Sequence, residues 1–193
     1  CASTGGGPKP VKRTPVNIEI QETVGFTITE KARIRNDVRL DYDQGVAALN
    51  RGDIEQGIEF LEAAASAAPG LSAPRIDLGV AYHQAGNVEA AEKHLQLALE
   101  TNPGHPIANN ELGIIYRKTG RFAEAKRSYE AALATYPGYH YARRNLAVLC
   151  DLYLGDLNCA LQNYEAYMAT VPDDDQASMW IKDLQYRMEQ AEK

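Results

Sequence analysis

Residues 106–139 read PIANNELGIIYRKTGRFAEAKRSYEAALATYPGY, and their landmark side chains recur along the chain at a fixed spacing. Within this stretch the landmarks are Leu112, Gly113, Tyr116, Gly120, Ala125, Tyr129, Ala132 and Pro137. One period of 34 residues earlier, the same chemical types stand at Leu78, Gly79, Tyr82, Gly86, Ala91, Leu95, Ala98 and Pro103. A fixed period of this length predicts stacked repeats of two helices each. Gly120 is expected to make the turn between the helices, and Pro137 to end the second one.

Two less regular copies flank this central pair. Before it, the matching offsets hold Gly45, Gly52, Leu61, Ala64 and Pro69. After it, Leu146, Ala147 and Cys150 begin a further copy, but its later landmarks, from Gly155 onward, all fall one residue late. The extra residue therefore lies between Cys150 and Gly155, at the end of a first helix.

The series resembles the tetratricopeptide repeat family, which places Leu-Gly-x-x-Tyr in the first helix of each repeat and Ala, an aromatic residue, Ala and Pro in the second. The resemblance covers about residues 38–174 and implies an all-α fold. In such a fold, a right-handed superhelix of helix hairpins is closed by a capping helix. The four repeats expected are 38–71, 72–105, 106–139 and 140–174, with the capping helix in 175–193. Their register predicts helices at about 54–67, 72–85, 88–101, 106–119, 122–135, 140–154, 157–170 and 176–191.

The N-terminal region has a different character from the repeats. Residues 1–15 are Gly, Pro, Lys and Thr with few apolar side chains, which predicts a flexible tether. Residues 16–28 alternate apolar and polar side chains, which suits an extended arm lying on the repeats, the form we favour, or a short hairpin. Thr27 and Glu30 have the spacing of a capping box, so a long first helix is expected over about 28–51.

Composition and missing motifs narrow the possible functions. The formal net charge of -6 argues against nucleic acid or anionic lipid as the main partner. The four histidines, at 83, 94, 105 and 140, lack the spacing of metal ligands and are expected on the surface or in a groove. Asp173, Asp174 and Asp175 are expected to cap the last helix rather than to bind calcium. No phosphate-binding loop or nucleophile motif is present, so we expect no catalytic residue, no cofactor and no metal.

The first residues, Cys1-Ala2-Ser3-Thr4 followed by Gly5-Gly6-Gly7, resemble a mature bacterial lipoprotein. In that class the Cys carries the lipid anchor, which is then the chain's membrane contact. Ala at the second position implies sorting to the outer membrane, facing the periplasm. The alternative is that Cys1 is only a boundary of the sequence.

Cys150 and Cys159 fall on the two antiparallel helices of the fourth repeat, on opposite sides of the Gly155 turn. If the chain is exported to an oxidising compartment, a disulfide is expected between them. The alternative is a pair of buried, reduced thiols that pack as small apolar groups.

The resemblance also implies that the first helices of the repeats line a concave groove that holds a protein or peptide. Carried onto this sequence, the partner-binding residues are Tyr42, Ile76, Val80, His83, Ile107, Asn110, Ile114, Arg117, Lys118, Tyr141 and Arg144. Their apolar stripe with a polar rim is typical of peptide grooves. The valines and isoleucines of the stripe are expected to pack partly between neighbouring first helices.

These observations favour a non-enzymatic adaptor that binds a partner in the groove, for assembly of an envelope complex such as a type IV pilus secretin. Alternatives are an adaptor for an envelope protease or peptidoglycan hydrolase, and a structural component that self-associates through its groove or last helix. The aromatic group Tyr136, Tyr139, His140 and Tyr141 is expected to pack at the junction of repeats three and four, or to form a contact site if exposed.

Overall fold

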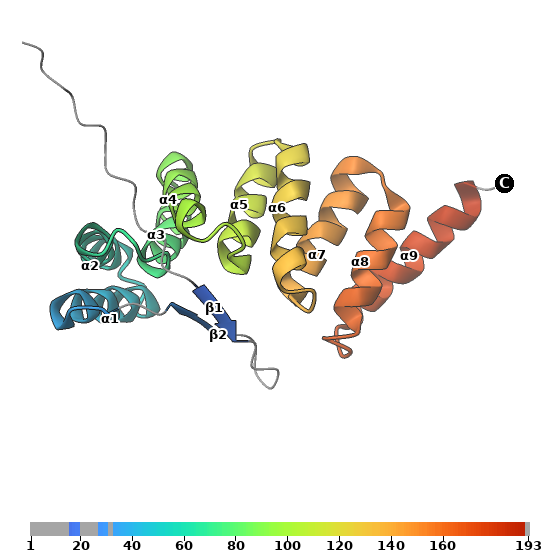
Figure 1. The fold of residues 1–193 in the computed structure, drawn as a ribbon. Coiled ribbons are helices and arrows are strands. Elements are labelled where there is room, and N and C mark those ends of the chain that lie inside the picture. The colour runs from blue at the N-terminus through green and yellow to red at the C-terminus, as the bar shows by residue number, and fades with distance from the viewer. Residues whose placement is uncertain (1–15, 20–26, 31–32, 192–193) are drawn as a thin grey trace, which may run out of the picture.

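The computed structural model describes residues 16–19, 27–30 and 33–191. Its helices stack side by side in one row, from α1 at one end to α9 at the other (Figure 1). The first two hairpins are α1 (Asn36–Asn50) with α2 (Ile54–Ala67) and α3 (Ala73–Gln84) with α4 (Val88–Thr101). The next two are α5 (Pro106–Lys118) with α6 (Phe122–Thr135) and α7 (His140–Leu149) with α8 (Leu157–Met168). The helix α9 (Asp175–Ala191) follows, so the all-helical superhelical fold expected from the repeats is confirmed.

A shared hydrogen bond closes every hairpin. The residue before the second helix donates its backbone N–H to a carbonyl near the end of the first helix, as Asn87 does to Tyr82 at 2.8 Å and Arg121 to Tyr116 at 2.8 Å. A glycine lies between the two residues with a positive φ, 81° at Gly86 and 77° at Gly120. Residues that have a Cβ atom rarely adopt this left-handed backbone conformation, so the turn requires glycine.

The fourth hairpin absorbs its extra residue in a π-helical turn. The turn η1 (Cys150–Leu154) continues α7, and Gly155 then takes the left-handed conformation, with φ 65°. The closing bond is kept, because Asp156 donates its N–H to the Cys150 carbonyl at 2.9 Å. One more residue is therefore accommodated inside the helix end without changing how the hairpin closes. This is where the sequence predicted the irregularity.

Close packing between the two helices of a hairpin depends on glycine. A Cβ atom placed on Gly113 of α5 would lie 2.4 Å from the Tyr129 Cε1 atom of α6. Gly79 of α3 faces Leu95 of α4 in the same way, with 2.5 Å to its Cγ atom. The small residue thus leaves room for a large side chain of the second helix, and both Tyr129 and Leu95 are fully buried.

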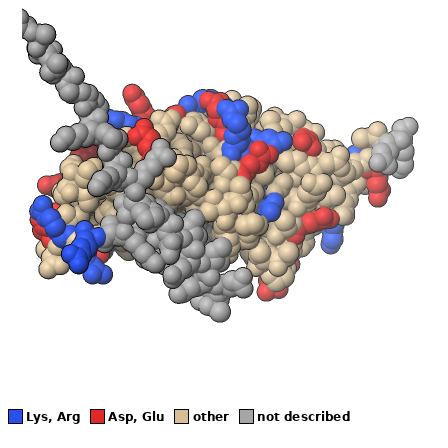
Figure 2. All heavy atoms as spheres, viewed as in Figure 1, with Lys and Arg blue, Asp and Glu red and all other residues tan. Residues whose placement is uncertain are grey.

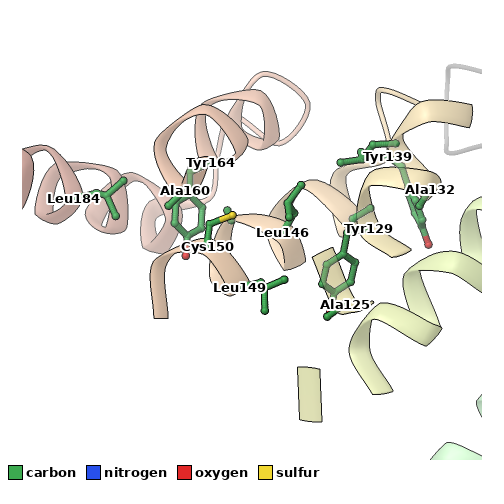
Figure 3. Close-up of a cluster of buried hydrophobic side chains, with 13 residues drawn as sticks. Ala125, Tyr129, Ala132, Tyr139, Leu146, Leu149, Cys150, Ala160, Tyr164 and Leu184 are labelled. Atoms are coloured by element: carbon green, nitrogen blue, oxygen red, sulfur yellow. The ribbon is translucent and has the colours of Figure 1, made fainter. Parts of the chain in front are cut away.

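The core continues through the fourth hairpin to the last helix. Figure 3 shows Tyr164 and Ala160 of α8 beside Cys150, with Leu184 of α9 on one side and Tyr129 of α6 on the other. The Tyr164 ring contacts the Trp180 ring of α9, with centroids 5.5 Å apart. Because α9 buries Ala177 and Leu184 against α8, it covers the end of the stack, as a capping helix must.

The start of α9 is capped as its acidic residues predicted. The Asp174 carboxylate accepts the Ala177 N–H at 3.0 Å and the Tyr167 hydroxyl at 2.7 Å. The N–H contact places negative charge at the positive end of the helix.

The N-terminal expectations need correction. Residues 16–19 and 27–30 form strands β1 (Val16–Glu19) and β2 (Thr27–Glu30), which pair antiparallel, with Ile18 opposite Ile28. The structure therefore has the short hairpin and not the extended arm that we favoured. The expected helix over 28–51 is wrong at its start, because the β-branched residues of Thr27–Glu30 lie in a strand and α1 begins at Asn36. The expected tether, 1–15, lies outside the described residues.

The packing of α5 against α6 gives a direct test of the repeat interpretation. Gly113→Ala should lower the free energy of unfolding by about 1 to 3 kcal/mol, because the new methyl group overpacks against the buried Tyr129 ring. Urea unfolding followed by circular dichroism measures the change. Ala123→Ser, at an exposed position of α6, is the control and should change stability by about 0.5 kcal/mol or less. Unchanged stability of the Gly113 variant would contradict this account of the packing.

Candidate functional site

The predicted partner-binding residues lie on α1, α3, α5 and α7, the first helices of the hairpins, and we call the surface that these helices share the A face. The helices contact one another in sequence, α1 with α3, α3 with α5, and α5 with α7. The A face is therefore one continuous surface built from residues far apart in the chain.

Apolar side chains in the middle of the A face are partly covered. Val80, Ile107 and Ile114 are half-buried, and the two isoleucines pack against the hydrophobic core. Val46 and Val148 behave in the same way, which confirms that part of the stripe packs between helices. The most exposed of the predicted apolar residues is Tyr141, with 58% of its surface accessible.

Two predicted binding residues belong to the interior instead. Ile76 is 4% exposed and packs in the core between α3, α4 and α5. Asn110 is 2% exposed, and its Oδ1 atom accepts a hydrogen bond from Asn145 at 3.0 Å. Both side chains leave almost no surface to a partner, because the next first helix covers them.

Hydrogen bonds between successive first helices cross the A face at a regular interval. The Tyr42 hydroxyl donates to Asp77 at 2.8 Å, and Lys118 Nζ lies 2.9 Å from His83 Nε2. These bonds join side chains 35 residues apart, as does the Asn145–Asn110 bond. They fix the position of each hairpin relative to the next, and they occupy Tyr42, His83 and Lys118 in part.

Burial shifts the pKa of several groups on this face. Burial raises the pKa of the Asp77 carboxyl, and the hydrogen bond from Tyr42 opposes the change. Burial likewise raises the pKa of Glu111. Burial and the nearby Lys118 ammonium lower the pKa of His83, so this ring is neutral at pH 7 and can accept a hydrogen bond from Lys118.

The cations of the A face lack acidic partners. Within the part of the chain that the structure describes, no carboxylate forms an ion pair with Arg117, Lys118 or Arg144. Aromatic rings hold the two arginines instead, Arg117 over Tyr153 at 5.7 Å and Arg144 over Trp180 at 5.4 Å. These three side chains keep their positive charge available for an anionic group.

Elsewhere, charges of both signs are mixed. On the face shown in Figure 2, acidic and basic side chains of the described helices lie close to one another over most of the row. One such contact joins Arg121 to Glu92, with Nη1 and Oε1 2.9 Å apart.

The four aromatic residues at the junction of repeats three and four differ in how much of each side chain is exposed. Tyr139 is 7% exposed, and its ring lies 5.9 Å from the Tyr141 ring and 6.5 Å from the His140 ring. Tyr136 stacks on Tyr139 from the preceding loop. The group therefore packs at the turn, as one of the two expectations had it, and presents mainly Tyr141.

The predicted disulfide is present. Cys150 and Cys159 are bonded, with their Cα atoms 5.8 Å apart, and the bond ties η1 to α8. Cys1, the predicted lipid site, lies outside the described residues.

We had expected His105 on the surface or in a groove, but its side chain is buried. It is 5% exposed, and its Nδ1 atom accepts the Ala108 N–H at 3.4 Å, so it caps α5. Burial lowers its pKa to about 4, which keeps the ring neutral and able to accept that bond.

Between residues 33 and 191 no three His, Cys, Asp or Glu side chains are grouped so that they could hold a metal ion. Of the described helices, none combines the length and the apolar character that crossing a membrane requires.

Two surface features lie outside the predicted set of partner-binding residues. One is the exposed run Leu152, Tyr153 and Leu154 on η1, whose last two residues stand where the other repeats have polar or small residues. The other is a pair of open pockets of about 620 and 430 Å³ between successive second helices, α4 with α6 and α6 with α8. Corresponding residues line them one repeat apart, such as Leu99 and Leu112 in the first and Leu133 and Leu146 in the second.

Stacked antiparallel helix pairs, each with the same closing bond and glycine turn, define a helical-repeat protein. Two family models, both described as tetratricopeptide repeat, match residues 48–110 and 106–139. Residues 48–139 therefore carry tetratricopeptide repeats, and neither matching model describes a catalytic family.

Solved structures share the fold. MamA from Desulfovibrio magneticus RS-1 is 18% identical, with a TM-score of 0.71 over 81% of this chain and 88% of that chain. Pseudomonas aeruginosa pilF is 19% identical, with a TM-score of 0.72 over 80% of this chain and 70% of that chain. YrrB, described as a TPR protein with an unusual peptide-binding site, is 21% identical, with a TM-score of 0.64 over 75% of this chain and 74% of that chain. At these identities the likeness shows the fold alone, and no curated protein matches the sequence.

The disulfide makes a measurable contribution to stability. Reduction should lower the free energy of unfolding by roughly 2.5 to 3 kcal/mol, because it releases a short loop in the unfolded chain. Urea unfolding with and without reductant measures this, and a Cys150→Ala/Cys159→Ala variant should not respond to reductant. Free thiols at both positions in the unreduced, exported protein, detected by alkylation and mass spectrometry, would contradict the bond.

Proposed function

We propose that the chain is a non-enzymatic adaptor that holds a partner protein or peptide against its A face. The observation that carries the proposal is the combination on this face of half-buried Ile107 and Ile114, exposed Tyr141 and the cations without acidic partners. Apolar residues would anchor the partner, and the cations would bind its backbone carbonyls or carboxylates.

We also propose a cellular location for the chain. The likeness of Cys1-Ala2-Ser3-Thr4 to the start of lipoproteins supports a lipid anchor at Cys1, in the bacterial outer membrane and facing the periplasm. A disulfide between Cys150 and Cys159 suits such an oxidising compartment. Assembly of an envelope complex such as a type IV pilus secretin is the role that we infer, and the shared fold with pilF is compatible with it.

Self-association is the second candidate. It is favoured by two large apolar side chains on α9 that face solvent, Met179 at 68% and Tyr186 at 62% exposed. Light scattering over a range of concentrations separates the two functions, since a concentration-independent monomer counts against self-assembly.

The A face is tested by placing charge among its anchors. A variant with Ile114→Glu and Tyr141→Glu should capture the envelope partner roughly thirtyfold more weakly, the loss expected for a central interface residue. Affinity capture after crosslinking in the native envelope, followed by mass spectrometry, measures the change. Ala123→Glu, an exposed residue of α6, is the matched control and should capture normally with the same helicity. Equal capture by the double variant would remove the assignment.

The anchor is tested on the protein isolated from its native membranes. Mass spectrometry of the N-terminal peptide should find Cys1 carrying a diacylglyceryl group in thioether linkage. An N-terminal peptide with an unmodified Cys1, or one in which other residues precede Cys1, would contradict the lipoprotein proposal without affecting the A face.

A further inference from the structure

The π-helical turn η1 exposes three consecutive large apolar side chains. Leu152, Tyr153 and Leu154 are 69%, 43% and 39% exposed, and Phe122 of α6 contacts the Tyr153 ring at 4.9 Å between centroids. We call these four residues the η1 patch. They lie at the end of the A face, where α7 gives way to the turn.

The fold does not require apolar residues at this place. In the other hairpins the two residues before the turn glycine are Asn50 and Arg51, Gln84 and Ala85, and Lys118 and Thr119. Those turns close with the same hydrogen bond and the same glycine conformation. Polar or small residues therefore serve the two positions of Tyr153 and Leu154 equally well. Leu152, three residues before its glycine, corresponds to Leu49, but Leu49 is partly buried whereas Leu152 is 69% exposed.

The turn that carries the patch is held in place from several directions. The disulfide ties Cys150 to α8, and Asp156 donates its N–H to the Cys150 carbonyl. The neighbouring Asp151 accepts a hydrogen bond from Arg187 of α9 at 2.6 Å. A surface fixed in this way loses little conformational entropy when it binds, and π-helical turns are frequent at functional sites.

Positive charge borders the patch on its α5 side. The Arg117 Nη1 atom lies 3.4 Å from the Tyr153 hydroxyl oxygen, whereas the next residue, Lys118, lies against His83 of α3. Arg117 has no carboxylate partner among the described residues, whereas Arg187, on the α9 side, pairs with Asp151 and Asp183. In a chain with a formal net charge of -6, an apolar surface beside an unpaired cation is complementary to an acidic, apolar segment.

We propose that the η1 patch, together with Arg117, is a docking site for a protein segment in which Asp or Glu adjoins a large apolar side chain. The apolar side chain packs on Leu152 and Tyr153 while the carboxylate meets the Arg117 guanidinium. The inference rests on the proposed adaptor function. It specifies the chemistry of the partner segment that extends beyond the A face onto η1. An anionic lipid surface is less favoured, because it would need a broad basic face, whereas the chain has a formal net charge of -6.

The site is tested by selecting ligands on the whole, disulfide-bonded chain. Display of random 12-residue peptides should enrich sequences with Asp or Glu next to Leu, Phe or Met. A selected peptide, labelled and measured by fluorescence polarisation, should bind about tenfold more weakly to Leu152→Ser and to Arg117→Glu. Met179→Ser, equally exposed on α9, is the matched control and should bind normally. Replacing the peptide's acidic residue by its amide should weaken binding by about tenfold or more.

Three other outcomes overturn the inference. The first is that the selected peptides lack acidic residues, and the second is that the peptide binds both site variants as tightly as the unchanged chain. The third is that the chain binds vesicles of phosphatidylcholine and phosphatidylserine in a way that depends on Leu152. A dimer in light scattering that Leu152→Ser converts to a monomer would show that a second copy occupies the patch. If Ile114→Glu abolishes partner capture and Leu152→Ser does not, only this inference falls. If Leu152→Ser weakens both capture and peptide binding and Ile114→Glu weakens neither, the docking site stands and the A-face proposal falls.

Discussion

The close approach of two helices around a glycine is the contact on which the rest of the structure depends. Gly113 lets the Tyr129 ring enter the space between α5 and α6, and Gly79 does the same for Leu95. The hairpin that results always ends in a glycine turn, closed by one backbone hydrogen bond. Because the first three hairpins share this geometry and the fourth keeps the closing bond and the glycine turn, the first helices align and side chains 35 residues apart meet across the A face.

That alignment decides which side chains are left for a partner. The hydrogen bonds between first helices occupy Tyr42 on α1 and Asp77 and His83 on α3, and the neighbouring helices cover Ile76 and Asn110. Of the predicted binding residues, the ones with the most surface left for a partner include Tyr141 on α7 and Lys118 on α5. At the end of α7 the π-helical turn adds apolar surface beside Arg117, which has no acidic partner among the described residues. The least regular repeat therefore offers the most varied binding surface, and the disulfide and α9 hold it in shape.

Sequence reasoning was most accurate where one local rule decides the structure. The bounds of α2, α4 and α6 follow from glycine turns and proline ends, and the position of the extra residue follows from late landmarks. It was wrong at Thr27–Glu30, since a capping-box spacing cannot show that β-branched residues will pair with a second strand. It also placed Ile76 and Asn110 on the surface, because burial there depends on how the next hairpin docks. The sequence shows that residues 152–154 before the turn glycine are apolar. It does not show that they are exposed, because their exposure depends on the π-helical turn.

The claim that a partner lies along the first helices and not along the second is best tested by site-specific photocrosslinking in the cells that produce the protein. A photoreactive phenylalanine analogue at Tyr141, which is exposed on α7, samples the A face. The same group at Gln162 of α8 samples the pocket between second helices. The account predicts that one partner protein is crosslinked from position 141 and is not crosslinked from position 162. Crosslinking of the partner from position 162 alone would contradict it.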